Sequence, residues 1–227
     1  MSNEEKIIKY FTKNYNKIGD DCAYLSQTKQ LISSDTLVEN IHFDLKYFTP
    51  KNIAHRLFTA NYSDIQSSGG KPKYVLLNLS FPNKNFRFVN KIIKNFHRYC
   101  LKYGIEIIGG DTTASDKIFL SLTIISDAIN KNKIIKRSQA KINDKIYTFS
   151  GIGYSKLGFM NIYKNLKLPK DISALSKKQF LSPKIYTYYD LFKKIKLNSC
   201  MDVSDSLLST LRSISSQSNK KIVLNNL

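Results

Sequence analysis

Cysteine, glycine and acidic residues are scarce in this chain of 227 residues, and tryptophan is absent. The three cysteines, Cys22, Cys100 and Cys200, lie far apart, which excludes a disulfide framework or a zinc knuckle and favours a reducing compartment. No apolar run approaches the roughly 18 residues that a membrane span needs. The N-terminus, with Glu4 and Glu5, has no signal-peptide layout. We therefore expect a cytoplasmic protein with no membrane partner.

The charge is strongly unbalanced, because 36 lysines and arginines face only 17 aspartates and glutamates, which gives a net charge of +19. Such an excess can indicate a nucleic-acid partner, since cations neutralise phosphates and release counterions. The cations are mostly lysines spread along the whole chain, however, and no arginine-rich stripe or aromatic stacking motif accompanies them. We interpret the lysine excess as background and do not expect a nucleic-acid partner.

Hydrophobic patterning predicts alternating helices and strands in two blocks. In the first block we expect helices at 3–11, 49–68 and 83–103 and strands at 22–26, 30–38, 74–81, 105–108 and 117–128. A basic segment, 130–145, follows. In the second block we expect strands at 145–149, 200–203 and 221–224, helices at 154–163, 183–195 and after a Ser204 cap, and a loop or linker at 165–182. The pattern predicts an N-terminal domain, 1–130, and a C-terminal domain, 131–227.

Two of these elements carry polar groups where a core is expected. The strand at 30–38 is apolar at both ends but has Ser33, Ser34 and Asp35 in its middle. The helix that begins at Pro50 has an apolar face whose periodicity continues onto Asp64. Carboxylates are therefore directed along surfaces that the fold would bury.

The few acidic residues share a local setting. Several aspartates lie in turns, at strand ends or at helix termini, next to hydroxyls or glycines: Asp20, Asp21, Asp35, Asp64, Asp111, Asp202 and Asp205. Carboxylate and hydroxyl oxygens are the ligands that Mg²⁺ selects, and glycine lets a backbone approach phosphates. The alternative for each aspartate taken singly is a helix N-cap or a turn residue.

Other chemistries have weaker support in the sequence. His55 and His97 fall on predicted helices and fit core or surface roles, whereas His42 directly follows the polar strand and can face the same site. There is no Gly-x4-Gly-Lys-Ser/Thr loop, and the pair Gly151 and Gly153 lacks the third glycine and the acid of a dinucleotide fingerprint. A nucleotide site in this chain is therefore of another type.

The motifs coincide, in order and spacing, with those of one family. They are IGDDCAYL (18–25), SSDTLVENIHF (33–43), ANYSDIQSSGGKPKYVLLNLSFP (60–82), YGIEIIGGDTT (103–113), IIKRSQAKINDKIYTFSGIG (134–153), LSPKI (181–185) and MDVSDSLLSTL (201–211). This set resembles thiamine-monophosphate kinase, within the superfamily of aminoimidazole ribonucleotide synthetase. Each motif is weak alone, and together they are specific to the family.

The resemblance implies an α/β (α+β) fold, in which an N-terminal mixed-sheet ATP-binding domain of the aminoimidazole ribonucleotide synthetase type pairs with its twin in a homodimer. An incomplete C-terminal α/β domain follows, because the family's later Gly-Gly-Glu-Asp-Tyr motif has no counterpart before Leu227. The implied reaction is Mg²⁺-dependent transfer of the ATP γ-phosphoryl group to thiamine monophosphate, giving thiamine diphosphate and ADP. The alternatives are a catalytically impaired nucleotide- or RNA-binding remnant, or another ATP-dependent member of the superfamily.

The resemblance also implies roles for single residues. Several Mg²⁺ ions would be held by Asp21, Ser33, Ser34, Asp35, Asp64, Asp111, Asp202 and Asp205. ATP would be contacted by Gly110, Asp111, Arg137 and Ser204, and thiamine monophosphate by His42. No residue is expected to act as a general base, because a phosphate oxygen is already anionic and catalysis reduces to alignment and charge neutralisation.

Overall fold

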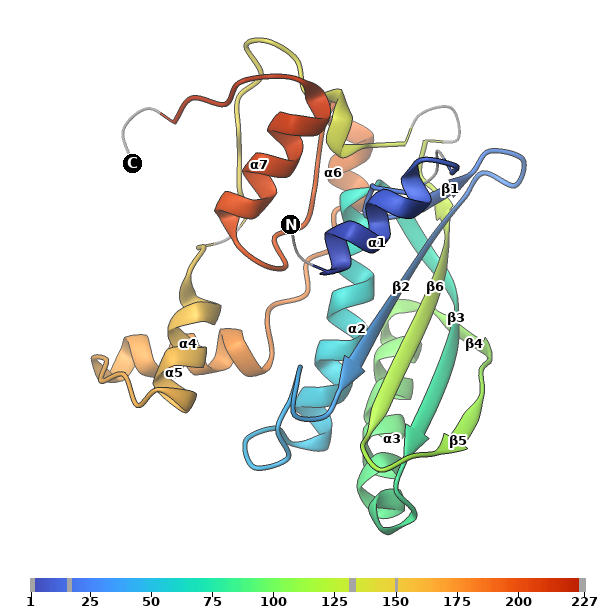
Figure 1. The fold of residues 1–227 in the computed structure, drawn as a ribbon, viewed down its shortest axis with the longest axis vertical. Coiled ribbons are helices and arrows are strands. Elements are labelled where there is room, and N and C mark those ends of the chain that lie inside the picture. The colour runs from blue at the N-terminus through green and yellow to red at the C-terminus, as the bar shows by residue number, and fades with distance from the viewer. Residues whose placement is uncertain (1–2, 16–17, 131–133, 150, 225–227) are drawn as a thin grey trace.

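The chain forms a mixed sheet with two long helices packed on one of its faces (Figure 1). The computed structural model describes residues 3–15, 18–130, 134–149 and 151–224. The strands are β1 (Ala23–Leu25), β2 (Gln30–Val38), β3 (Gly70–Phe81), β4 (Glu106–Gly109), β5 (Thr112–Ala114) and β6 (Phe119–Ala128). Their order is β1-β2-β6-β3-β4, and β5 also pairs with β3. The pairs β2–β6 and β3–β6 are antiparallel, whereas β4 and β5 run parallel to β3.

The two faces of the sheet differ in burial. Along β6 the alternate side chains of Leu120, Leu122 and Ile124 are almost fully buried, and they form a core with α2 (Pro50–Ser67) and α3 (Phe86–Tyr103). The opposite face is polar, with Ser34 hydrogen-bonded to Thr123 at 3.1 Å and no helix over it in Figure 1. A sheet with a period-two pattern and one covered face is the arrangement that such alternation predicts.

Helix α2 starts where the sequence predicts. Thr49 is its N-cap, accepting from the Asn52 backbone N–H at 3.2 Å, while Asn52 accepts in return from the Thr49 backbone N–H at 3.1 Å. This capping box and Pro50 at the first helical position fix the start of the helix. The buried face of α2 includes Ile53 and Leu57, so the same face leads two turns later to Asp64.

Most predicted elements of the first block are confirmed, with small corrections. Helix α1 (Asn3–Thr12), β1, β2, α2 and β6 match their expected ranges within two residues. Strand β3 begins earlier than predicted, at Gly70, and the helix predicted from residue 83 begins as a 3₁₀ turn, η1 (Asn83–Asn85), before α3. The short strand β5 was not predicted, because three residues are too few to show an alternating pattern.

All the regular elements that the structure describes after residue 130 are helices. The second block contains α4 (Tyr154–Tyr163), α5 (Lys170–Leu181), α6 (Tyr189–Lys194) and α7 (Leu207–Ser218), after a 3₁₀ turn, η2 (Arg137–Gln139). None of these helices, nor any other in the described residues, is long and apolar enough to cross a bilayer. The mixed α/β fold class is confirmed, and the division into two domains stays a prediction.

Several predictions for the second block are wrong. The expected strands at 145–149, 200–203 and 221–224 are irregular, because the sole pairing near them is an isolated bridge between Lys136 and Ser199. The expected linker at 165–182 contains α5. Its buried residues, Ser176 and Phe180, are too few among the lysines to give a clear helical pattern in the sequence. The N-cap of α7 is Ser206 rather than Ser204.

The helix predicted from Pro183 begins only at Tyr189. The intervening segment is held along α2 instead, since the Pro183 carbonyl lies 2.5 Å from His55 Nε2 and the Tyr188 N–H donates to the Gln66 side chain at 2.8 Å. These contacts to a distant part of the chain satisfy backbone groups that a helix would otherwise pair internally.

Candidate metal and nucleotide site

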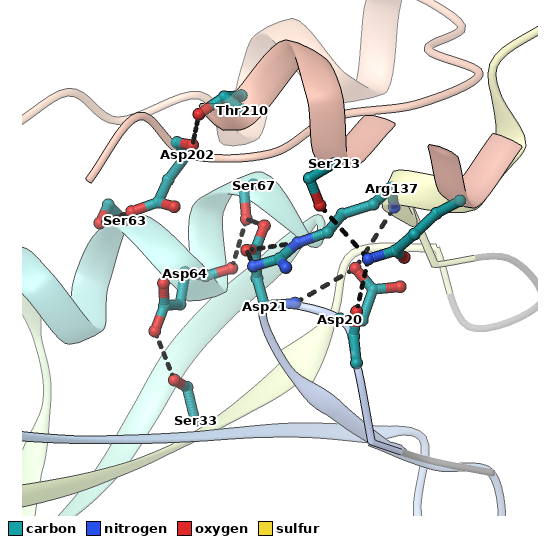
Figure 2. Close-up of polar contacts among 12 residues, drawn as sticks. Asp20, Asp21, Ser33, Ser63, Asp64, Ser67, Arg137, Asp202, Thr210 and Ser213 are labelled. Carbon is teal, nitrogen blue, oxygen red and sulfur yellow. Dashed lines mark hydrogen bonds and ion pairs between the residues drawn. The ribbon is translucent and has the colours of Figure 1, made fainter. Parts of the chain in front are cut away.

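Three carboxylates from distant parts of the chain meet at one point. Oxygens of Asp21, Asp64 and Asp202 all lie within 4.8 Å of one another (Figure 2). Asp21 comes from the turn before β1, Asp64 from the last turns of α2, and Asp202 from the segment before α7. The fold of both blocks is therefore needed to assemble the cluster.

Each of these carboxylates accepts a hydrogen bond from a serine (Figure 2). The hydroxyl of Ser33 on β2 donates to Asp64 at 2.5 Å. Two further serines lie on α2, where Ser63 donates to Asp202 at 2.9 Å and Ser67 donates to Asp21 at 2.5 Å. Residues 63 and 67 are one helical turn apart, so α2 presents two donors on the side that faces the cluster.

The electrostatics of the cluster favour a bound cation. Burial, together with the charges of Asp202, Asp35 and Asp21, raises the pKa of Asp64 to about 8. Burial, with the charge of Asp21 added, raises the pKa of Asp202 to about 6. A divalent cation among these oxygens would remove the repulsion, and carboxylate and hydroxyl oxygens are the donor set of Mg²⁺. The residues present therefore fit the metal that the sequence predicts.

Asp35 lies beside this cluster and connects it to His42. Its backbone N–H donates to the fully buried Asn61 side chain of α2 at 3.1 Å, which fixes the strand against the helix. Burial raises the pKa of Asp35, and the nearby His42 opposes that shift. Nδ1 of His42 in turn accepts from the Val38 backbone N–H at 3.0 Å, so the imidazole is held at the end of β2.

Arg137 binds the outer side of the cluster. Its Nε donates to Oδ1 of Asp21 at 3.0 Å, and a terminal guanidinium nitrogen forms a second bond and ion pair with the same oxygen. The Arg137 backbone N–H lies 3.3 Å from Oδ1 of Asp20, whose pKa is raised by burial. Asp21 is thus shared between Arg137 on one oxygen and Ser67 on the other.

A cleft of about 780 Å³ opens beside the carboxylates. Its acidic end is lined by Asp35, Asp64 and Asp202, with Ser204 and Asp205 on the exposed segment before α7. The opposite wall is formed by the start of α4, where Gly151, Gly153 and Lys156 line the same cleft. The cleft therefore has room for a ligand longer than a single ion.

Three residues of the predicted site lie away from this cluster within one chain. The Ser34 side chain is on the opposite sheet face, bonded to Thr123. Gly110 and Asp111 are exposed at the junction of β4 and β5. Because β6 and β3 separate β2 from β5, three strand spacings put Asp111 about 14 Å from β2.

Gly110 is required by its backbone surroundings. Its φ is +148°, and a Cβ at this position would lie 1.8 Å from the carbonyl oxygen of Leu77. The backbone of the next residue, Asp111, is also held against β3, because its carbonyl accepts a hydrogen bond from the Leu79 N–H at 2.8 Å. The Gly-Gly-Asp motif is thus packed tightly against β3, with its carboxylate outward.

Sequence reasoning missed several residues that shape the site. Ser63 and Ser67 are four residues apart, a spacing that places both on one side of a helix next to Asp64 and could have marked them as part of the site. Asn61, fully buried next to the same face, carried a similar signal. Arg56, discussed below, gave no sign beyond its rarity.

Known proteins match most of this chain in sequence and in fold. The family AIR synthase related protein, N-terminal domain, matches residues 19–127. The curated thiamine-monophosphate kinase of Buchnera aphidicola subsp. Schizaphis graminum is 34% identical over 222 residues, covering 92% of this chain and 68% of that one. The chain belongs to the thiamine-monophosphate kinase family. The corresponding enzyme of Leptospira interrogans is 32% identical over 204 residues, covering 88% of this chain and 65% of its own length.

Solved structures of the family share the fold. AaThiL complexed with AMPPCP and TMP superposes with a TM-score of 0.82 at 26% identity, covering 96% of this chain and 72% of that one. The enzyme from Stenotrophomonas maltophilia K279a, at 24% identity and a TM-score of 0.75, covers 94% and 71% and shows the fold alone. The chain spans about two thirds of the length of the curated relatives it matches.

Proposed function

We propose that this chain transfers the γ-phosphoryl group of ATP to the phosphate of thiamine monophosphate, giving thiamine diphosphate and ADP. The family supports the reaction, and the related AaThiL binds AMPPCP and TMP. The observation that carries the proposal is the carboxylate cluster of Asp21, Asp64 and Asp202, which lies at one end of a cleft large enough for a nucleotide.

In this proposal the cluster holds Mg²⁺. Asp21, Asp35, Asp64 and Asp202 supply carboxylate oxygens, and Ser33 supplies a hydroxyl. Mg²⁺ held by these oxygens would supply positive charge beside the phosphates of ATP. Metal binding would explain why carboxylates cluster at one site in a chain whose net charge is +19.

Residues in the cleft and around the cluster contact the two substrates. Ser204 and Asp205 lie on the rim beside Asp202, where Ser204 reaches ATP and Asp205 a further metal ion. Arg137 contacts ATP in the same proposal. When it is paired with Asp21, its positive charge balances the negative charge of that carboxylate. His42, next to Asp35, contacts the phosphate of thiamine monophosphate. No general base is assigned, because the attacking phosphate oxygen is anionic at neutral pH.

We propose that the chain acts in the cytoplasm as a homodimer. The three predicted site residues that lie away from the cluster, Ser34, Gly110 and Asp111, fit such a pairing. Ser34 faces the polar side of the sheet that no helix covers, and Gly110 and Asp111 lie at its exposed edge. Apolar side chains are also open to solvent on the edge strand β4, where Ile108 is 48% exposed, and at the start of β6, where Phe119 is 39% exposed. We propose that two copies pair through this face, and that Ser34, Gly110 and Asp111 take their metal and ATP roles there.

A coupled ADP-release assay tests the reaction. The purified chain is incubated with ATP and Mg²⁺, with and without thiamine monophosphate, and thiamine diphosphate is measured by chromatography. We expect ADP and thiamine diphosphate in equal amounts, and neither after chelation of Mg²⁺ with EDTA. ADP release that is independent of thiamine monophosphate, or no release at all, would contradict the proposal.

A further inference from the structure

Arg56 is a partly buried cation that forms no ion pair with an acidic group among the described residues. It lies on α2, and its Nη1 nitrogen is buried without a hydrogen-bond partner. Its guanidinium carbon is 5.6 Å from the ring centre of Phe48 and 5.3 Å from that of Phe180. Burial lowers the pKa of Arg56, and nearby Tyr163 opposes that shift. A buried donor left unpaired is destabilising, and more so when it is charged.

Arg56 lines two cavities that meet at its side chain. One is the 780 Å³ cleft with the carboxylate cluster at its acidic end. The other, of about 380 Å³, is lined by His42, Asp44 and aromatic rings that include Phe159 and Tyr163. Arg56 precedes Asp64 by eight residues on α2, a rise of about 12 Å along the helix. The cation therefore lies at the end of the site opposite to the metal ligands.

This arrangement suits one kind of ligand. A cavity with aromatic walls and a single unpaired cation at its inner end fits a molecule with an aromatic ring and an anionic group. His42 and Arg56 both line the smaller cavity, so the two side chains face a common space. Burial, with the charge of Arg56 added, lowers the pKa of His42. An anion placed between them would be directed toward the carboxylate cluster and its metal.

We propose that the Arg56 guanidinium binds the phosphate of the acceptor substrate, a phosphate monoester that carries an aromatic group, and positions it for attack on ATP. This inference rests on the proposed function, since it names how that site takes its acceptor. A planar guanidinium holds two phosphate oxygens at once, which leaves the third free to react. Its charge also offsets the repulsion between the acceptor and the triphosphate.

The test compares ligands with and without the phosphate. Binding of thiamine monophosphate and of thiamine is measured by calorimetry for the wild type, Arg56→Met and Arg56→Gln. Arg98→Met on α3, an exposed arginine outside both cavities, makes the same charge change and serves as the matched control. Two substitutions are used because Arg56 packs between aromatic rings and one variant alone could lose stability.

We expect affinity for thiamine monophosphate to fall about 10- to 100-fold in both Arg56 variants, the loss of a charge-assisted bidentate contact. Affinity for thiamine should change less than twofold, and Arg98→Met should match the wild type. In steady-state assays KM for thiamine monophosphate should rise while KM for ATP stays constant. Arg56→Lys, which keeps the charge without the planar fork, should recover part of the loss.

Three results would overturn the inference. Equal losses for thiamine and thiamine monophosphate would assign Arg56 to packing alone. A rise in KM for ATP in place of the acceptor would assign it to the donor. Unchanged affinity for thiamine monophosphate would remove any role in anion binding. A wild type that binds the monophosphate through Arg56 yet transfers no phosphoryl group would refute the reaction but keep the anion site, whereas no binding would refute both.

Discussion

The two halves of the chain are built differently, and the site lies between them. Residues 18–128 form a sheet whose buried face packs on α2 and α3 and contains nearly all of the core. Residues 134–224 are helices and irregular segments in which few apolar side chains, such as Phe180 and Leu211, are fully buried. Three of the four central carboxylates come from the first half, and Asp202 comes from the second. The half with the larger core thus supplies most of the ligands, and the less buried half completes the cleft.

The strongest way to test this comparison is to remove the central carboxylate. Asp64→Asn should lower kcat by about 100-fold or more, because a metal ligand is lost from the cluster. The same change should raise the unfolding free energy without Mg²⁺ by about 2 kcal/mol at pH 7. Asp64 is ionised in the unfolded chain at this pH but, with a pKa of about 8, must take up a proton on folding, and asparagine does not carry that cost. Activity is measured by ADP release and stability by urea unfolding.

Asp127→Asn is the control for that variant, since Asp127 is about half exposed and pairs with Lys73 on the surface. It should leave kcat and stability nearly unchanged. Wild-type turnover in Asp64→Asn would disprove the metal assignment, and an equal loss in Asp127→Asn would point to a general charge effect.

A core substitution in each half should separate their contributions to stability. Leu122→Ala removes a side chain that is fully buried under α2 and α3, and it should cost about 3 kcal/mol of global stability. Leu211→Ala on α7 removes one that is 7% exposed, and it should cost less globally but weaken Mg²⁺ binding by loosening Asp202. Urea unfolding and Mg²⁺ titration measure the two effects. Equal global losses with equal metal affinity would mean that the halves unfold and bind as one unit.

The pH dependence of stability should change when metal is added. The pKa of Asp64 is raised to about 8 and that of Asp202 to about 6, both above the usual value of 3.8. These groups therefore bind protons more tightly when folded, so stability without metal should fall as the pH rises from about 4 to 8. With Mg²⁺ the fall should shrink or disappear. Thermal unfolding across this range, with Mg²⁺ or EDTA, measures it, and a flat EDTA profile would argue against a strained cluster.

The smallest effect is expected from a serine that supports a ligand. Ser67→Ala removes the hydroxyl that donates to Asp21 at 2.5 Å, and it should weaken Mg²⁺ binding about tenfold with little change in kcat at saturating metal. Ser216→Ala, an exposed serine on α7, is the matched control. No difference between the two variants would mean that Arg137 alone orients Asp21.

The sequence predicted the first half well for a physical reason. Strong alternation in β6, a capping box at Thr49 and Gly104 at the end of α3 are local signals, and each element forms where its own residues favour it. In the second half the signals were misleading, because α5 has a short apolar face among lysines. Segment 182–188 follows α2 through contacts with His55 and Gln66 that no local pattern encodes.

The site was predictable to a similar degree. Asp21, Asp64 and Asp202 were identified from their small neighbours, and the structure brings them together. The orientation of Ser34, away from the cluster, follows from strand alternation with Ser33, which fills the inward position. Arg56 could not be identified, because an unpaired cation is defined by what the fold places around it rather than by its own sequence.

The hydrogen bond between Ser63 and Asp202 joins residues 139 positions apart. A divalent ion at the cluster would strengthen that connection into a cross-link between the two halves, and closing so long a loop restricts the unfolded chain more than a short one would. The ion would then stabilise the fold as well as take part in catalysis. Binding of a nucleotide with Mg²⁺ would therefore stabilise the contact between the second half and the sheet, and product release would weaken it.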